Sequence, residues 1–333
     1  MSKWGETIKI PTREACGQML AQIGEKNEDI FVLEADISKS TRTCYFADKF
    51  PERFLNVGIA EQNLVNVGVG LASLGKKVYV STYAVFASMR ACEQLRTFAC
   101  YPKNKITVLA SHGGLTPGND GPTHQAIEDM GIMRTLPNMS VMMPADSTAT
   151  KALLKESVYW EGPLYIRLTR DPVPTIYDES EIFKIGKGKI VREGSDIAII
   201  ANGDMVYFSI KAAEVLKRKN ISARVVDMHT IKPLDEELVA DCVKKTGAIV
   251  TVEDHNMYNG LGSAVAEIIA EKHQVPFKKV AIKDTFAESG EYKELIKKYG
   301  LDTEHIVETV IETLSKKITK EKIHCEENLR ISI

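Results

Sequence analysis

Long hydrophobic runs are missing from this sequence. No stretch of it approaches the roughly 20 consecutive apolar residues that a membrane-spanning helix needs. Its first residues, MSKWGETIKIPTRE, also lack the apolar core of a secretory signal peptide. We therefore expect a cytoplasmic protein that has no membrane partner.

Cysteine is scarce and charge is balanced. The six cysteines include no CxxC pair and fall far short of the density of a disulfide scaffold, so we expect reduced thiols and no metal site in this chain. The 43 Lys and Arg residues against 45 Asp and Glu residues give a net charge of -2. Because a nucleic-acid-binding surface needs an excess of basic residues, we expect no nucleic-acid partner.

The sequence does contain a regular alternation of short apolar runs and longer helical patterns. A helix is predicted from Glu61 to Leu74, and Gly75 is a natural terminator for it. Buried strands are predicted at residues 30–33, 78–81, 106–110, 139–143 and 164–168. Alternation of this kind is typical of an α/β protein in which helices cover both faces of a parallel sheet.

The alternation breaks at residues 171–190, where prolines, glycines and acidic residues gather. It then resumes, with strands predicted at 197–201, 223–227 and 248–253 and helices between them. This pattern predicts two α/β domains, of which the second is the smaller. The predicted boundaries are 1–175 for the first domain, 176–192 for a linker, 193–315 for the second domain and 316–333 for a charged, loosely attached tail.

The stretch GNDGPTHQAIED, residues 118–129, places Asp120 and His124 on a segment that proline stiffens and glycine loosens. A core segment would not use these residues, whereas a loop that presents polar groups to a ligand would. A purely structural turn between the two side chains is the alternative interpretation.

Two further stretches carry candidate site residues. Glu61 begins an otherwise apolar helix, where an acid either complements the helix dipole or serves in acid–base chemistry. Tyr83, Phe86 and Met89 recur every three residues directly after a predicted strand. Such an aromatic stripe is usually core, but at the end of a strand in an α/β fold it could also bind a flat ring.

Taken in order, these motifs resemble the transketolase family of thiamine diphosphate enzymes. The resemblance is carried by GIAEQN, DGPTHQ, RTLPNMSVMMPAD, LTRDPVP and EDHNMYNGLGSAVAE. It covers nearly the whole chain, but only the second half of a standard transketolase. It therefore implies the C-terminal subunit of a split, two-chain transketolase, with a pyrimidine-binding domain followed by a smaller transketolase C-terminal domain.

A motif that the family requires is missing. Enzymes of this kind hold the cofactor diphosphate through Mg²⁺ with a GDG motif and a later asparagine, and the nearest stretch here, NGDMV at 202–206, lacks the second glycine. The resemblance thus implies that an N-terminal partner subunit holds Mg²⁺ and the diphosphate, and that this chain is inactive alone. Two copies of each chain are expected, with the helix that begins at Glu61 as the candidate contact on the two-fold axis.

The resemblance also implies the reaction and the role of each site residue. A two-carbon ketol unit would pass from a ketose phosphate to an aldose phosphate, as in the pentose phosphate pathway. Glu61 would hydrogen-bond the cofactor's aminopyrimidine and activate it. The implied catalytic residues are Glu61 and His124, the cofactor-binding residues are Glu61, Phe86, Tyr83 and Asp36, and the substrate-binding residues are His112, Asp120, His124, Arg170, Ser40 and Arg13.

Three alternatives stay open at this point. A 1-deoxyxylulose-5-phosphate synthase-like half shares the DGxTHQ pattern, although Pro122 and the LTRDPVP segment favour a transketolase. The β subunit of a 2-oxo acid dehydrogenase has a similar layout, but we would not expect it to carry His112 together with DGPTHQ. A non-catalytic regulatory partner could have kept the fold, but Glu61 and His124 are both present.

Overall fold

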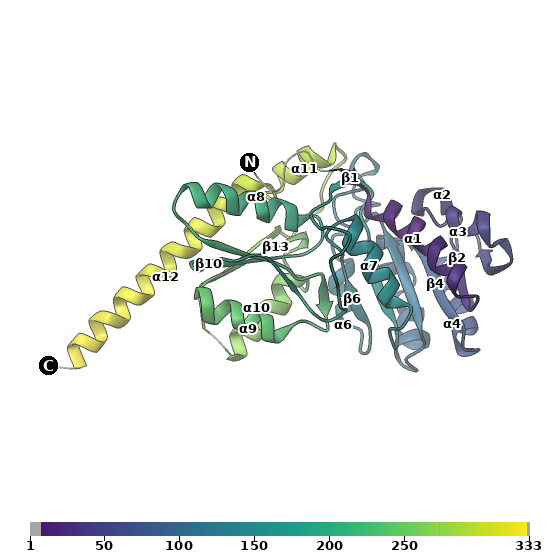
Figure 1. Ribbon diagram of the computed structural model, residues 1–333, viewed down its shortest axis with the longest axis horizontal. Helices are drawn as coiled ribbons and strands as arrows, with labels where there is room; N and C mark the ends of the chain where they lie inside the picture. The colour runs from purple at the N-terminus through teal and green to yellow at the C-terminus, as the bar shows by residue number, and fades with distance from the viewer. Residues whose placement is uncertain (1–7, 273, 332–333) are drawn as a thin grey trace.

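Two layered α/β domains make up the protein (Figure 1). The computed structural model describes residues 8–272 and 274–331. The larger sheet has the strand order β12-β6-β7-β5-β4-β2-β3, and all its strands except β12 are parallel. Its strands are β2 (Ile30–Glu34), β3 (Phe54–Asn56), β4 (Lys77–Tyr83), β5 (Ile106–Ser111), β6 (Ser140–Met142), β7 (Leu164–Arg167) and β12 (Thr230–Lys232).

Helices cover both faces of this sheet, as the sequence predicts. Successive residues of a strand point to opposite faces, so Val32 packs in the core beneath α1 and α7 while Leu33 packs in the core beneath α4 and α6. The helices are α1 (Thr12–Lys26) and α7 (Ser147–Ser157) on one face and α4 (Glu61–Ser73) and α6 (Asp129–Thr135) on the other. The predicted fold class is confirmed.

The segment after β4 departs from a simple helix. Tyr83 is still in the strand, and the chain then forms π-helical turns at η2 (Phe86–Arg90) and η3 (Leu95–Cys100) around the short α5 (Cys92–Gln94). Because π turns shift the helical register, the three-residue spacing of Tyr83, Phe86 and Met89 does not make one helical face. Tyr83 and Phe86 are half-buried, whereas Met89 is exposed.

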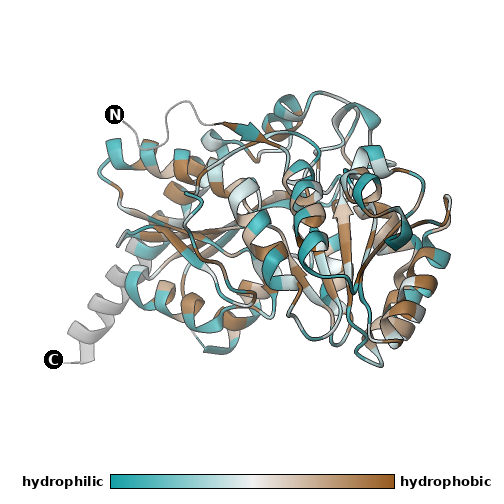
Figure 2. Ribbon diagram, turned by 45° about the vertical axis from the view of Figure 1, so that its right-hand side comes forward, coloured by the Kyte–Doolittle hydropathy of each residue, from teal (hydrophilic) through white to brown (hydrophobic). Residues whose placement is uncertain are grey.

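The second domain is a five-stranded sheet with helices on both faces. Its strand order is β14-β13-β10-β11-β9, and only the edge strand β9 is antiparallel. The strands are β9 (Lys189–Arg192), β10 (Ile197–Ala201), β11 (Ala223–Asp227), β13 (Ile249–Asn256) and β14 (Phe277–Ile282). Helices α8 (Met205–Arg218) and α12 (Thr303–Ile331) cover one face, and α9 (Glu236–Thr246) and α10 (Leu261–Lys272) cover the other. Apolar strands run through the interior between more polar helices (Figure 2).

The two domains are joined by more than one connection. Strand β12 leaves the second domain and pairs with β6, so it completes the sheet of the first. The buried Asp146 carboxylate accepts the backbone N–H groups of Ile176 and Tyr177, and Tyr177 donates to Asp227 of β11 at 2.8 Å. The segment expected to be a linker is therefore packed against both domains from its first residues.

The remaining short elements lie at the rims of the domains. Near the site described below are α2 (Ser38–Thr41) and η4 (Gly118–Asp120), and the paired strands β1 (Lys9–Ile10) and β8 (Val173–Pro174) lie close by. Helix α3 (Cys44–Lys49) and the turn η1 (Pro51–Arg53) lead to the amino end of β3, and α11 (Tyr292–Lys298) belongs to the second domain. Helix α12 continues to Ile331, through the segment expected to be a loosely attached tail, and extends away from the second domain in Figure 1.

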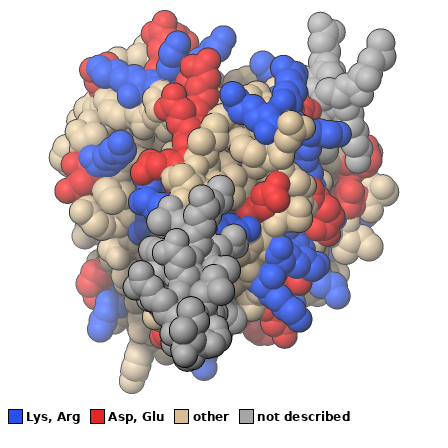
Figure 3. Space-filling model, turned by 90° about the vertical axis from the view of Figure 1, so that its left-hand side faces the viewer, with Lys and Arg blue, Asp and Glu red and all other residues tan. Residues whose placement is uncertain are grey.

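Charge on the surface is mixed. The face shown in Figure 3 carries interspersed acidic and basic side chains, in line with the balanced composition. Among the residues that the structure describes, no helix combines the length and apolar character needed to cross a membrane.

Candidate functional site

The predicted site residues gather at one edge of the larger sheet. Glu61 follows β3, Tyr83 ends β4, His112 follows β5 and Arg170 follows β7. These strands are parallel, so their carboxyl ends meet at the same edge. That edge is where open α/β sheets bind ligands.

Glu61 is the buried acid of this site. It is the first residue of α4, and only 2% of its surface is exposed. Its carboxylate accepts a hydrogen bond from Arg90 Nη1 at 2.7 Å and one from Thr82 Oγ1 at 3.3 Å. The guanidinium of Arg90 also lies over the Phe86 ring, 4.5 Å from its centroid. A planar cation therefore contacts both Phe86 and the Glu61 carboxylate.

The site also contains a cluster of four rings, those of Tyr83, Phe86, His112 and His124. Tyr83 stacks near Phe86 with 5.9 Å between centroids, and its ring lies 3.9 Å from that of His112. His124 meets both aromatic rings edge-on, at 5.6 Å from Phe86 and 5.9 Å from Tyr83. The histidine of the 118–129 loop thus faces the aromatic pair, and its Nδ1 is 3.0 Å from Thr123 Oγ1.

His112 is buried and neutral. Burial, and then the nearby charges of Arg13 and Arg170, lower its pKa to about 2. Its Nε2 lies 3.3 Å from Arg13 Nη1 and its Nδ1 lies 2.8 Å from Ser111 Oγ. Because the guanidinium only donates, Nε2 must accept that bond, which places the ring proton on Nδ1 facing Ser111.

Arg13 and Arg170 form a cationic pair beside His112. Burial, followed by the like charges of Arg42 and Arg170, lowers the pKa of Arg13. Arg13 Nη1 donates to the Ser40 carbonyl at 2.7 Å, while the buried Nε of Arg13 has no hydrogen-bond partner among the described residues. A buried donor in a cationic cluster favours the binding of an anion here.

Arg170 and Asp120 form a partly exposed ion pair beside the site. Their side chains are 3.8 Å apart, and each is about one-third exposed. Arg170 Nη1 also donates to the Pro117 carbonyl, and the Arg170 backbone N–H donates to Thr116 Oγ1 at 3.1 Å. Arg170 therefore contacts the loop that carries Asp120 as well as facing solvent.

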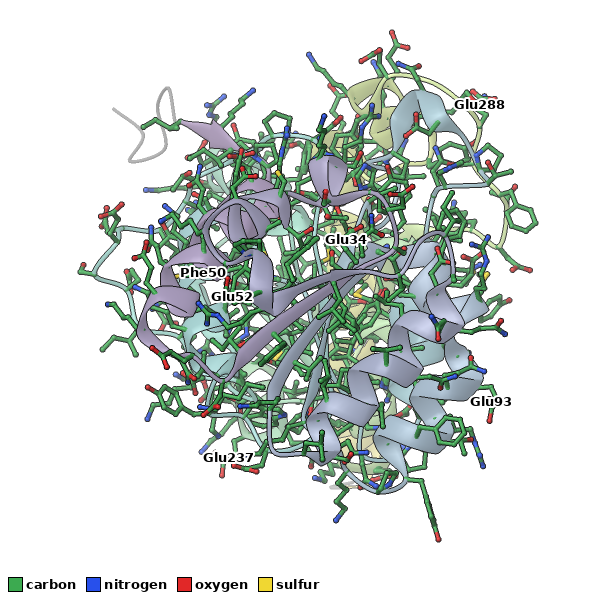
Figure 4. All side chains as sticks on the ribbon, turned by 90° about the vertical axis from the view of Figure 1, so that its right-hand side faces the viewer. Glu34, Phe50, Glu52, Glu93, Glu237 and Glu288 are labelled. Carbon is green, nitrogen blue, oxygen red and sulfur yellow. The ribbon has the colours of Figure 1, made fainter. Side chains whose placement is uncertain are left out.

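Two predicted residues lie at the rim of the site. Asp36 is exposed, has a positive φ of 65° and accepts a hydrogen bond from Asn56 Nδ2 at 2.8 Å. Ser40 reaches the site through its backbone carbonyl. The buried Glu34, labelled in Figure 4, lies behind this segment. Its carboxylate accepts the Ile37 N–H and the Thr41 hydroxyl and so holds the turn between them.

Sequence reasoning missed Arg90 and the buried residues behind the 118–129 loop. Arg167 lies in the apolar strand LYIRL, and its guanidinium forms an ion pair with Asp129 at 3.1 Å with both side chains fully buried. A charged residue inside an apolar strand is a signal that a buried partner exists, but it does not reveal which one. Among the described residues, no group of three or more His, Cys, Asp or Glu side chains is placed to hold a metal ion.

Comparison with known proteins assigns this arrangement to a family. Residues 8–175 match the family model "Transketolase, pyrimidine binding domain", and residues 186–306 match "Transketolase, C-terminal domain". The chain belongs to the transketolase family. The resemblance drawn from its motifs is confirmed.

The chain matches split members of the transketolase family over nearly their full length. It is 44% identical over 307 residues to a "Putative transketolase C-terminal section" of Methanocaldococcus jannaschii, and the match covers 91% of this chain and 96% of that protein. It is 36% identical to an apulose-4-phosphate transketolase subunit of Phocaeicola vulgatus, covering 92% of this chain and 98% of that protein. The match to human transketolase, at 35% identity, covers 92% of this chain but only 50% of that protein.

A solved structure of a split transketolase also matches this chain over nearly its full length. A protein described as "Split gene transketolase, inactive beta4 tetramer" superposes with a TM-score of 0.87 at 46% sequence identity, covering 92% of this chain and 99% of that chain. The present chain thus corresponds to the C-terminal section of a split transketolase.

Proposed function

We propose that this chain is the C-terminal subunit of a thiamine-diphosphate-dependent transketolase and acts only with an N-terminal partner subunit. The assembled enzyme would transfer a two-carbon ketol unit from a ketose phosphate to an aldose phosphate. The observation that carries the proposal is the placement of the buried Glu61 carboxylate beside Phe86, with a planar cation in contact with both.

The residues of this chain fit the aminopyrimidine end of thiamine diphosphate. The Arg90 guanidinium is flat, stacks on an aromatic ring and donates N–H to a buried carboxylate, and an aminopyrimidine could use the same two partners. When bound, the cofactor supplies the nucleophilic carbon and the electron sink for cleavage beside the ketose carbonyl. Glu61 would hold a proton at the ring nitrogen N1′, and Phe86 and Tyr83 would orient the ring.

The remaining predicted residues suit a phosphorylated sugar. His124 and Asp120 would bind sugar hydroxyls next to the aromatic pair. Arg13 and Arg170 would supply positive charge to the phosphate, and Arg13 Nε, a buried donor without a hydrogen-bond partner among the described residues, could bind it. Because its pKa is lowered to about 2, His112 would act as a neutral hydrogen-bonding group and not as a cation.

Ser40 and Asp36 would have lesser roles. The Ser40 carbonyl orients Arg13, so Ser40 would act on the phosphate through that arginine. Asp36 lies at the exposed rim beside Asn56, where the diphosphate end of the cofactor and the partner subunit would approach.

The partner subunit is required because this chain has no GDG…N module for Mg²⁺ and the diphosphate. The cofactor would lie between the two subunits, and two copies of each would give two equivalent sites. The related split transketolase chain that forms an inactive tetramer supports the view that this chain alone lacks activity. We place the enzyme in the cytoplasm and in the pentose phosphate pathway.

A related split subunit is named for 6-deoxy-6-sulfo-D-fructose and another for apulose-4-phosphate. Both compounds carry an anionic group, and a site with two arginines suits a ketose that ends in one. We therefore propose a phosphorylated ketose as the donor for the present enzyme.

Donor use is the experiment that tests this function. The chain, assembled with its N-terminal partner, is assayed with a ketose phosphate and with pyruvate as donor, and aldose-phosphate elongation by two carbons is followed. We expect two-carbon transfer from the ketose phosphate and no product from pyruvate. Condensation of pyruvate with glyceraldehyde 3-phosphate would favour the 1-deoxyxylulose-5-phosphate synthase alternative, and turnover with neither donor would favour a regulatory partner.

A further inference from the structure

The loop of residues 112–127 carries three of the six proposed substrate-binding residues. It begins with His112 at the end of β5 and presents Asp120 and His124. The two legs of the loop meet where the Gly114 N–H donates to the Ala126 carbonyl at 2.8 Å. The loop contains one short 3-10 turn and isolated bridges between its two legs, so contacts at its base help to fix its shape.

The end of strand β13, in the second domain, contacts both legs of this loop. The Asp254 carboxylate accepts the Leu115 N–H at 2.9 Å on one leg. The Asn256 N–H donates to the Ile127 carbonyl at 2.7 Å on the other leg. The second domain therefore holds the loop at its base, through groups other than those proposed to bind the sugar.

Close packing makes the contact with Asp254 specific. Gly114 has a positive φ of 62°, and a Cβ at that position would lie 2.0 Å from Asp254 Oδ2. Arg167 Nη1 donates to the Asp254 carbonyl at 2.7 Å, and Arg167 Nη2 donates to Ala126. Asp254 and Arg167 thus enclose the base of the loop from two sides.

We propose that Asp254 is a positioning residue for the sugar-binding loop, through which the second domain sets the geometry of His112, Asp120 and His124. The inference rests on the proposed function for its effect on substrate. Asp254 is fully buried, and its Oδ1 has no hydrogen-bond partner among the described residues. A carboxyl group buried there with one oxygen unpaired lowers the stability of the fold, and burial raises the pKa of Asp254 to about 7. The hydrogen bond that its other oxygen, Oδ2, accepts comes from Leu115 of the loop.

Amide hydrogen exchange tests the structural half of the proposal on the chain as it is. Asp254→Ala should speed exchange of amides 113–127 by about tenfold, because the hydrogen bond from Leu115 to Asp254 at the base of the loop is lost. Asp254→Asn keeps an oxygen that can accept from Leu115 and should restore most of the protection. Asp227→Ala is the matched control, since Asp227 is equally buried in the second domain but bonds Tyr177.

Steady-state kinetics of the assembled enzyme test the functional half. Asp254→Ala should raise the KM for a ketose phosphate by about tenfold while thiamine diphosphate affinity stays within about twofold of wild type, and Asp254→Asn should largely restore KM. Equal exchange in the Asp254→Ala and wild-type loops, or equal changes in KM and cofactor affinity, would overturn the proposal. If wild type transfers no ketol unit, the proposed function fails, whereas the exchange result still decides the role of Asp254 in the loop.

Discussion

The guanidinium of Arg90 and the carboxylate of Glu61 form an ion pair of 2.7 Å at the start of α4. Arg90 is 45% exposed, so it can swing into solvent, whereas Glu61 is fixed by burial. If the aminopyrimidine uses Glu61 and Phe86, it competes with Arg90 for both partners. The ion pair would then be broken each time the cofactor binds.

The first prediction concerns this competition. Arg90→Gln should tighten thiamine diphosphate binding by roughly fivefold in the assembled enzyme, because the ion pair of the half-exposed Arg90 with Glu61 and a cation–π contact no longer have to be broken. Isothermal titration calorimetry measures the effect, with Arg96→Gln as a control on an exposed arginine of the same segment. Weaker binding in Arg90→Gln would mean that Arg90 supports Glu61 with the ring in place.

The second prediction concerns Glu61 itself. Glu61→Gln keeps the size of the side chain but removes the carboxylate, so turnover at saturating cofactor should fall by roughly two to four orders of magnitude. The thermal midpoint should change little, since the amide can still bond Thr82 and Arg90 donates to its oxygen. Glu93→Gln, on an acid at the periphery in Figure 4, is the control. Near-normal turnover of Glu61→Gln would reduce Glu61 to a helix-terminal acid.

The third prediction separates phosphate binding from loop support at Arg170. Arg170→Ala should raise the KM for a phosphorylated donor by about 10- to 150-fold, the cost of one charged hydrogen-bonding partner. Hydroxypyruvate, a donor without phosphate, should be affected much less. Because Arg170 also donates to the Pro117 carbonyl, equal losses for both donors would show that its role is to hold the loop. Arg218→Ala on the surface of the second domain serves as the control.

The fourth prediction concerns assembly. Apolar side chains on and beside α4 are exposed, namely Ile59, Leu74, Met89, Phe98 and Tyr101. Leu74→Glu should therefore prevent the two-plus-two complex from forming, since a charge would be buried at the contact. Native mass spectrometry of the reconstituted complex measures this, with Ile182→Glu as a control at a distant exposed apolar residue. A stable, active one-to-one heterodimer of the wild-type chains would refute the two-plus-two assembly.

Much of the fold was predictable because its strands are short apolar runs. The predicted strand at 197–201 coincides with β10, and the predicted helix at 61–74 differs from α4 by one residue. Strand β12 was not predictable, because three residues carry too little pattern and their pairing with β6 is a tertiary event. The π-helical turns that begin at Phe86 were not predictable either, because no residue type specifies them.

The location of the candidate site was predictable, but its internal contacts were not. Glu61, Tyr83, His112 and Arg170 each lie at or just after the end of a strand, and strand ends share an edge in a parallel sheet. The bond from Leu115 to Asp254 joins residues 139 positions apart, so no local pattern could reveal it. The functional roles of the site residues stay predictions until the variants above are measured.

Reconstitution from separate subunits tests the central claim most directly. The purified chain, a purified N-terminal transketolase subunit from the same genome, and mixtures of the two are assayed for ketol transfer with thiamine diphosphate and Mg²⁺. The account predicts no transfer by either chain alone and activity that rises with added partner until the chains are equimolar, because each site needs residues from both. Appreciable ketol transfer by the isolated, homogeneous chain would contradict it.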